Sequence, residues 1–207
     1  MNSNSHSYKQ KLIAITPLLL TSLVCVFFIV LIHQLTKEKI TENRQRAALT
    51  IINDVMPANY DNDIFNDNIK IDVPTYINNT NSITAYRARL NNQPVAVSLM
   101  PVMTKGYNGS ISLIIGIAYD GTLNGVRIIS HHETEGFGDK AHQDKSDWLL
   151  QFNNHNIETS AKDKWAIKKD DGEFDQLSGA TITSRSIINI IYKTLEYYTE
   201  NRDKFYL

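Results

Sequence analysis

A run of apolar residues near the start of the chain, 12–32, contains no charged side chain. As a helix it would span about 32 Å at a rise of 1.5 Å per residue, which matches the hydrocarbon core of a bilayer. The run is longer than the apolar region of a signal peptide, and residues 31–35 lack a small-x-small cleavage pattern. We therefore expect an N-terminal tail over 1–11 and an uncleaved transmembrane helix over 12–32, with a cleaved signal peptide as the alternative.

Beyond this run, apolar residues recur at helical spacing up to position 56, and Pro57 ends the pattern. We expect a juxtamembrane stalk helix over 33–57. The following stretch, 58–82, is rich in Asn and Asp, which favours a linker with a short extended piece at 69–71. A calcium-binding loop is excluded there, because the carboxylates lack the alternating ligand spacing and the terminal Glu.

After residue 82 the pattern changes to a period of two, which is typical of strands. The alternation and the polar turns predict two hairpins, formed by 83–90 with 94–100 and by 112–119 with 126–130. The remaining patterns predict a short helix at 144–152, a strand-like piece at 165–168 and a final helix at 184–201. We expect an α+β fold in which 83–207 form one domain with an antiparallel sheet and helices.

Composition and charge narrow the classes of function. Lys and Arg number 21 against 22 Asp and Glu, a net charge of −1, whereas a nucleic-acid-binding protein would carry a basic excess. The lone cysteine, Cys25, excludes an intramolecular disulfide, a multi-cysteine zinc site and a cysteine-ligated iron–sulfur cluster. A redox centre in this chain would therefore be organic or haem-like.

The segment directly before the final helix is the first candidate for chemistry: Asp175-Gln176-Leu177-Ser178-Gly179-Ala180-Thr181. Gly179 and Ala180 leave the backbone sterically open, and Thr181 lies just upstream of a helix N-terminus, where free N–H groups and the helix dipole favour a phosphate. The simpler interpretation is a helix cap with Thr183 or Ser184 as the N-cap residue. The segment matches neither a P-loop nor a nucleophile elbow.

The second candidate is the stretch His131-His132-Glu133-Thr134-Glu135-Gly136-Phe137-Gly138. A metalloprotease motif would need a histidine at position 136, which is Gly136. A metal site built from His131, His132 and His142 stays open as an alternative, although tandem histidines at a strand end are more often solvated or packed. We expect no metal site and no catalytic residue in this chain.

The pattern Asp-x-x-Ser-Gly-Ala-Thr at 175–181 resembles the covalent flavin attachment motif of the FMN-binding domain family. Further short motifs agree with one branch of that family in order and spacing: Gly106-Tyr107-Asn108-Gly109, Gly116-Ile117, Gly125-Val126, His132-Glu133-Thr134, Gly138-Asp139-Lys140, Lys145-Ser146-Asp147-Trp148 and Glu173-Phe174-Asp175. Each is weak alone, but together they resemble the G subunits of the Rnf/Rsx electron-transport complex. A more distant resemblance is to the C subunits of the sodium-translocating NADH:quinone reductase.

The resemblance implies an FMN whose phosphate is esterified to Thr181, with Asp175 as the acidic residue of the motif. A flavin transferase would install it from FAD, since no base that could activate the threonine lies nearby in sequence. The resemblance also implies contacts to the flavin from the attachment loop and the second candidate stretch, at Ser178, Gly179, Ala180, Glu133, Thr134 and Lys145. Capping a turn, local backbone contacts and solvation are the plainer roles of these side chains. Two departures from the family pattern occur: Glu135 replaces a proline and Phe137 a leucine.

The implied function is that of an electron-relay subunit, with little activity alone, in a membrane complex that couples electron transfer to ion translocation. The implied location is the inner membrane, with a single span in contact with lipid, the other Rnf/Rsx subunits as partners and the soluble domain on the periplasmic side. Charge does not fix this orientation, because lysines and arginines flank the span on both sides. The alternatives are an anchored, cofactor-free interaction domain and a flavinylated subunit of another respiratory complex.

Overall fold

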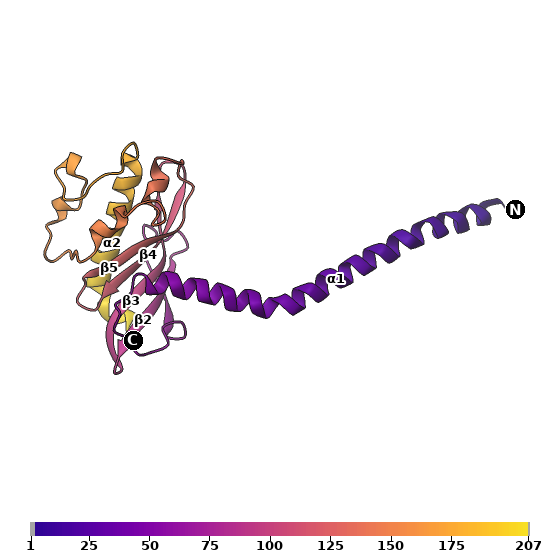
Figure 1. Ribbon diagram of the computed structural model, residues 1–207, viewed down its shortest axis with the longest axis horizontal. Coiled ribbons are helices and arrows are strands. Elements are labelled where there is room, and N and C mark those ends of the chain that lie inside the picture. Colours follow the sequence, from indigo (N-terminus) through magenta and orange to yellow (C-terminus); the bar gives the residue numbers. More distant parts are fainter. Residues whose placement is uncertain (1–2, 207) are drawn as a thin grey trace. The chain divides into compact units, whose positions relative to one another are not determined.

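The computed structural model describes residues 3–206 and divides the chain into two units, 1–48 and 49–207 (Figure 1). Helix α1 runs from Ser3 to Asn53 and includes the window Leu20–Lys37, which is long and apolar enough to cross a membrane. Residues 1 and 2 and the side chains of 3–11 in the predicted tail, and the side chains of 12–16, 18 and 19 in the predicted span, lie outside the described residues. The described apolar side chains of the window are exposed, as lipid contact would require.

The end of α1 corrects the predicted boundary by a few residues. The helix ends at Asn53 and not at Pro57, because the N–H groups of Val55 and Met56 turn back to carbonyls only three residues earlier, those of Ile52 and Asn53. This tight turn directs the chain onto the sheet of the second unit, which begins at Leu49.

The second unit is built on a five-stranded antiparallel meander in the order β1-β2-β3-β4-β5 (Figure 1). Its strands are β1 (Asn68–Asp72), β2 (Ser82–Leu90), β3 (Gln93–Lys105), β4 (Ser110–Ala118) and β5 (Leu123–Ser130). The β2–β3 turn places Asn91 and Asn92 at φ values of 51° and 64°, a conformation that asparagine tolerates better than most residues. Both predicted hairpins and the α+β class are confirmed.

The Asn/Asp-rich stretch contributes more to the fold than a linker would. It contains β1, which pairs antiparallel with β2 from Asn68 opposite Tyr86 to Asp72 opposite Ser82. Its widely spaced apolar side chains are buried, at Ile64, Ile71, Val73 and Ile77. Only Ile71 and Val73 are two positions apart, and Ile64 and Ile77 lie too far from them to extend the alternation, so the sequence pattern indicated only a short extended piece.

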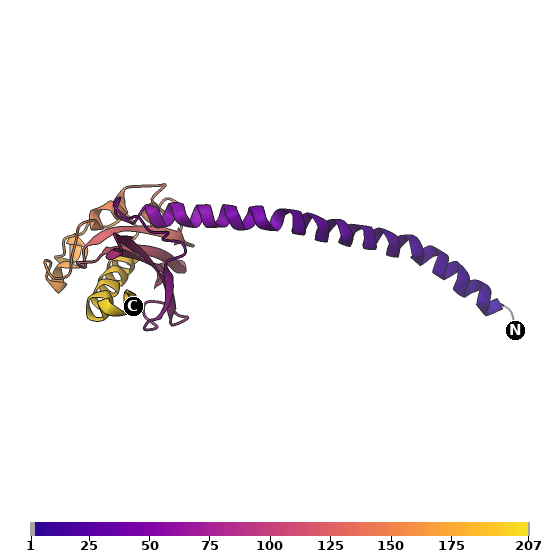
Figure 2. The same ribbon diagram turned by 90° about the horizontal axis from the view of Figure 1, so that it is seen from below.

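Both faces of the sheet are covered. Helix α2 (Thr181–Asn201) lies against one face of the sheet (Figure 2). Its side chains Ile187, Ile191 and Leu195 belong to the buried cluster on that face. On the other face Ile52 and Val55 pack against Ile114 of β4. A Cβ on Gly116 would overlap the carbonyl oxygen of Val55, so the missing side chain lets the backbone lie directly on the sheet.

Three local predictions needed correction in the connection between β5 and α2. The predicted helix at 144–152 is a 3-10 helix over Trp148–Phe152. The strand-like piece at 165–168 separates the 3-10 helices Lys162–Lys164 and Lys168–Asp170, and Ile167 forms a single bridge with Phe174. The alternation of apolar and polar residues at 165–168 reflects the burial of Trp165 and Ile167 in the core, where Trp165 contacts the ring of Phe174, and not the pairing of a strand. The final helix begins at Thr181, three residues earlier than predicted. The β-branched residues Thr181 and Ile182 are weak helix formers, so the sequence pattern gave no signal for the first turn.

Candidate functional site

The segment 175–181 leads straight into α2, and Thr181 is the first helical residue. The N-cap residue is Ala180, so neither Thr183 nor Ser184 fills that position, and among the described side chains none caps the helix there by hydrogen bonding. The Ser184 hydroxyl instead donates to the Ala180 carbonyl and accepts the Leu177 N–H, both at 3.0 Å. The helix N-terminus therefore keeps the free N–H groups that attract an anion.

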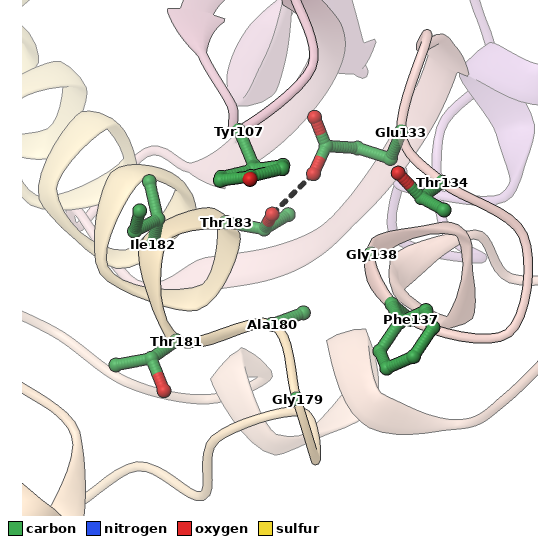
Figure 3. Close-up of a pocket in the computed structure, with 10 residues that line it drawn as sticks. All are labelled: Tyr107, Glu133, Thr134, Phe137, Gly138, Gly179, Ala180, Thr181, Ile182 and Thr183. Carbon is green, nitrogen blue, oxygen red and sulfur yellow. Dashed lines mark hydrogen bonds between the residues drawn. The ribbon is translucent and has the colours of Figure 1, made fainter.

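A pocket of about 460 Å³ opens beside this helix start (Figure 3). Three segments form it: the turn between β3 and β4, the loop after β5, and the beginning of α2. The ten lining residues are Tyr107, Glu133, Thr134, Phe137, Gly138, Gly179, Ala180, Thr181, Ile182 and Thr183. Residues nearly 80 positions apart in the sequence thus share one cavity.

The pocket has apolar walls that are open to solvent. The exposed fractions of Tyr107, Phe137 and Ile182 are 72%, 52% and 51%, which is unusual for large apolar or aromatic side chains gathered in one place. Aromatic and aliphatic walls with a few polar groups are typical of sites for flat organic ligands. Thr181 lies at the rim, on the far side of the helix start from Glu133 (Figure 3). Its hydroxyl donates to the Gln176 Oε1 at 3.3 Å.

The floor of the pocket holds a carboxylate that is almost fully buried. Glu133 is 8% exposed, and one of its oxygens, Oε2, accepts the hydroxyl of Thr183 (Figure 3). The other, Oε1, accepts the backbone N–H of Asn108 at 2.9 Å. A buried carboxylate is stable only with such partners.

Comparison with known proteins assigns the chain to a family. The model of the FMN-binding domain matches residues 106–196, a range that includes all three pocket segments, and the model of the RnfG N-terminal region matches 17–55. The G subunit of the ion-translocating oxidoreductase complex of Vibrio atlanticus is 36% identical over 170 residues, which cover 82% of this chain and 81% of the relative. The Pseudoalteromonas atlantica protein of the same name is 37% identical over 172 residues, covering 83% and 80%. The chain belongs to the family of these G subunits.

Among solved structures, a similar chain is the C subunit of the Na⁺-translocating NADH-quinone reductase from Parabacteroides distasonis. It is 21% identical with a TM-score of 0.47, covering 62% of this chain and 64% of that one. The predicted family resemblance is confirmed by the sequence relatives, and the chain contains an FMN-binding domain.

Eight residues were predicted to contact the cofactor, and the structure brings five of them together. Lining the pocket are Glu133, Thr134, Gly179, Ala180 and Thr181. Ser178 is exposed beside Gly179 and lies outside the lining set. The carboxylate of Asp175 pairs with Lys168 Nζ at 2.8 Å, and its backbone carbonyl accepts the indole N–H of Trp148. Lys145 lies outside this lining set, in a neighbouring hollow with His131 and His142 that shares Glu133 with the pocket.

Five lining residues were not among the predicted site residues: Tyr107, Phe137, Gly138, Ile182 and Thr183. The first three lie within motifs that carried the family resemblance or beside its departures, so a signal for them was present. Ile182 had none, because an apolar residue in the first turn of a helix is usually part of the core. Thr183 was considered only as a helix cap, and its contact with Glu133 across 50 residues has no sequence signature.

Two of the three histidines considered as metal ligands, His131 and His142, lie near each other. The rings of His131 and His142 lie 5.7 Å apart between centroids. Among the residues that the structure describes, no group of three or more His, Cys, Asp or Glu side chains is arranged to hold a metal ion.

Arg185, the cationic side chain of α2 nearest to Thr181 in sequence, already pairs with a carboxylate. Arg185 lies one turn after Thr181, and its guanidinium donates two hydrogen bonds to Asp170 at 2.7 and 2.8 Å. This hydrogen bonding to Arg185 lowers the pKa of the Asp170 carboxyl below its usual value. A phosphate at Thr181 would therefore depend first on the helix N-terminus, unless Arg185 exchanged its partner.

Proposed function

We propose that this member of the G-subunit family is an electron relay that carries FMN covalently bound, through a phosphoester, to Thr181. It would work within a membrane complex that couples electron transfer to ion translocation. The observation that supports this most is the position of Thr181. Its hydroxyl lies at the rim of an apolar-walled pocket and at an uncapped helix N-terminus, inside the range matched by the FMN-binding domain.

The residues present fit such a group. A phosphate on Thr181 would meet the N-terminal N–H groups of α2 and their dipole. Tyr107, Phe137 and Ile182 offer the apolar surface that a flat ring system needs, and together they would exclude water from part of it. When bound, FMN supplies reversible one- and two-electron chemistry, and a covalent tether prevents its loss over many cycles.

The threonine needs help to react. Its hydroxyl donates to Gln176, whose neutral amide cannot act as a base. We therefore infer a separate flavin transferase that uses FAD. In that reaction the Thr181 oxygen forms a bond to the FMN phosphorus, the pyrophosphate link of FAD breaks, AMP leaves, and the transferase accepts the hydroxyl proton.

The cellular setting is part of the proposal. The apolar window Leu20–Lys37 would anchor the chain in the inner membrane in contact with lipid. The flavin domain would then lie on the periplasmic side, beside the other subunits of the complex, so that assembly and not diffusion sets the electron-transfer distance. A chain with 1–32 removed should then fail to support electron transfer in the complex.

The deciding experiment is in-gel flavin fluorescence of the denatured full chain, co-expressed with a flavin transferase and exported. The wild type should fluoresce and Thr181→Ala should be dark, whereas Thr159→Ala, which removes the hydroxyl of an exposed threonine outside the pocket lining, should fluoresce like the wild type. Tandem mass spectrometry of the tryptic peptide 170–185 should place FMN on Thr181. A dark wild type beside a fluorescent control substrate would exclude the carrier function and leave an anchored interaction domain.

A further inference from the structure

Three backbone segments meet at the carboxylate of Glu133. Its two oxygens accept the Asn108 N–H and the Thr183 hydroxyl. Two glycines make room for it, since a Cβ on Gly106 would overlap Oε1 and one on Gly138 would overlap Oε2. The β3–β4 turn, the loop after β5 and the first turn of α2 are therefore held by one side chain.

The exposed wall residues of the pocket lie directly beside these contact points in the chain. Tyr107 stands between Gly106 and Asn108, and Phe137 precedes Gly138. Ile182 precedes Thr183, and Thr181 lies one position earlier on the same helical turn. The contacts of Glu133 therefore fix the backbone next to each wall residue, and with it the orientation of the wall side chains and the position of Thr181.

We propose that Glu133 is the positioning residue of this site, a brace that locks the start of α2 to the two loops carrying the aromatic walls. The proposal rests on the proposed flavin function for its purpose, although the brace itself is a property of the protein alone. It assigns Glu133 a role different from the direct flavin contact that the sequence indicated. Both of its oxygens already accept protein donors, so the role assigned to it at the floor of the pocket is to hold the three segments.

The physical basis is the cost of leaving a buried acceptor without a donor. A hydrogen bond to a carboxylate is stronger than one between neutral groups, and removal of one partner leaves the desolvated oxygen unpaired. Because the carboxylate lies near the N-terminus of α2, the helix dipole adds to this attraction. Breaking the link should loosen the three segments together, while the sheet core, which is packed elsewhere by aliphatic side chains, stays closed.

The chain offers matched variants for a test. Thr183→Val removes the donor at nearly constant volume, and Thr183→Ser restores it. Thr194→Val makes the same change at another fully buried threonine of α2, whose hydroxyl donates only to the Ile190 carbonyl of its own helix. Glu133→Asp shortens the brace by one methylene, with Glu158→Asp as its control at an exposed glutamate.

Amide hydrogen exchange of the flavin-free full chain in detergent reads the brace directly. One reporter lies on each segment: the N–H groups of Gly106, Asp139 and Ser184 donate to the carbonyls of Gly109, Thr134 and Ala180. We expect Thr183→Val and Glu133→Asp to speed exchange at all three by about tenfold, while β4 amides stay at the wild-type rate. Thr183→Ser, Thr194→Val and Glu158→Asp should match the wild type at the three reporters.

Wild-type exchange at the three reporters in both Thr183→Val and Glu133→Asp would overturn the brace. So would faster exchange that also included β4, because it would indicate general destabilisation. The initial rate of flavin transfer to the same variants gives the functional consequence, a loss of about tenfold in Thr183→Val that Thr183→Ser recovers. If the wild type accepted no flavin, the proposed function would fail while the exchange data still decided the brace.

Discussion

The ring of Phe137 lies directly on the backbone of Gly179, so that a Cβ added to Gly179 would approach Phe137 Cδ1 to 2.6 Å. Gly179 also has a φ of +77°, which side-chain-bearing residues rarely adopt. Phe137, one of the two positions at which the motif pattern predicted another residue, is therefore in contact with the loop that carries Thr181.

Gly179→Ala should lower the free energy of unfolding by about 2 kcal/mol, because left-handed strain and the clash with Phe137 add together. Gly136 provides the control: its φ is +80°, but nothing lies within 4 Å of a Cβ there, so Gly136→Ala should cost about 1 kcal/mol. Denaturant unfolding of the full chain in detergent measures both. Adding Phe137→Leu to Gly179→Ala should recover the difference, and equal costs for the two glycines would show that the Phe137 contact is not a constraint.

Two buried hydroxyls near the C-terminus predict a loss of stability in alkali. Tyr198 and Tyr206 lie with their oxygens 3.0 Å apart, and burial raises the pKa of Tyr198 to about 12 and raises the pKa of Tyr206 as well. In the unfolded chain both hydroxyls ionise near pH 10, so this stability is fully present below pH 10 and is lost as pH rises above it.

Each group should lower the free energy of unfolding by up to about 1.4 kcal/mol per pH unit above pH 10. Tyr198→Phe should therefore flatten the decline between pH 10 and 11, measured by denaturant unfolding at fixed pH. Tyr107→Phe, at an exposed tyrosine, should retain the wild-type decline. An unchanged slope in Tyr198→Phe would mean that this hydroxyl ionises in the folded chain as easily as in the unfolded one.

The Asn/Asp-rich stretch is joined to β2 by charge as well as by strand pairing. Asp67 accepts from Arg87 Nε at 2.5 Å and from Arg89 Nε at 2.9 Å, and all three side chains are mostly buried. Asp67→Asn should lower the free energy of unfolding by about 1.5 kcal/mol, because charge-assisted bonds are replaced by neutral ones. Asp61→Asn, at an exposed residue, should change it by less than about 0.5 kcal/mol, and comparable losses would contradict the role of the arginines.

Gly116→Ala should disturb the sheet face opposite α2. The new methyl group would overlap the Val55 carbonyl oxygen, so the chain after α1 must move off β4. We expect a loss of at least about 2 kcal/mol and faster proteolysis near residue 55. Gly125→Ala makes a milder contact, with its Cβ 3.4 Å from Val55 Cα, and should cost less. Wild-type protease resistance in Gly116→Ala would show that the segment tolerates displacement.

The hairpins were predictable because alternation and polar turns are local signals. Strand β1 was only partly visible, since Ile71 is the one buried residue within it, and the burial of Ile64 and Ile77 on either side depends on contacts far away in sequence. The start of α2 was misplaced for the opposite reason: β-branched residues disfavour a helix locally, and tertiary contacts, including that of Thr183 with Glu133, stabilise its first turn.

The residues of the candidate site also divide into those that a local sequence signal reveals and those that only the fold brings together. Thr181 and its loop could be found because a contiguous motif contains them. The pocket itself could not, since Tyr107, Phe137 and Ile182 become neighbours only through the meander and the helix that follows it. Lys145 and Asp175 shared the motifs but lie outside the pocket lining, because sequence proximity does not determine the direction of a side chain.

The packing of Ile52 and Val55 on β4 also bears on how a water-soluble form should be cut from the chain. A fragment starting at 58 or 83 would expose Ala88, Ala96 and Ile114, now buried on that face. The second of these fragments would also leave β2 as a bare edge. Such fragments should self-associate. A fragment that begins shortly before Leu49 retains Ile52 and Val55, which cover this face of the sheet, and should stay monomeric.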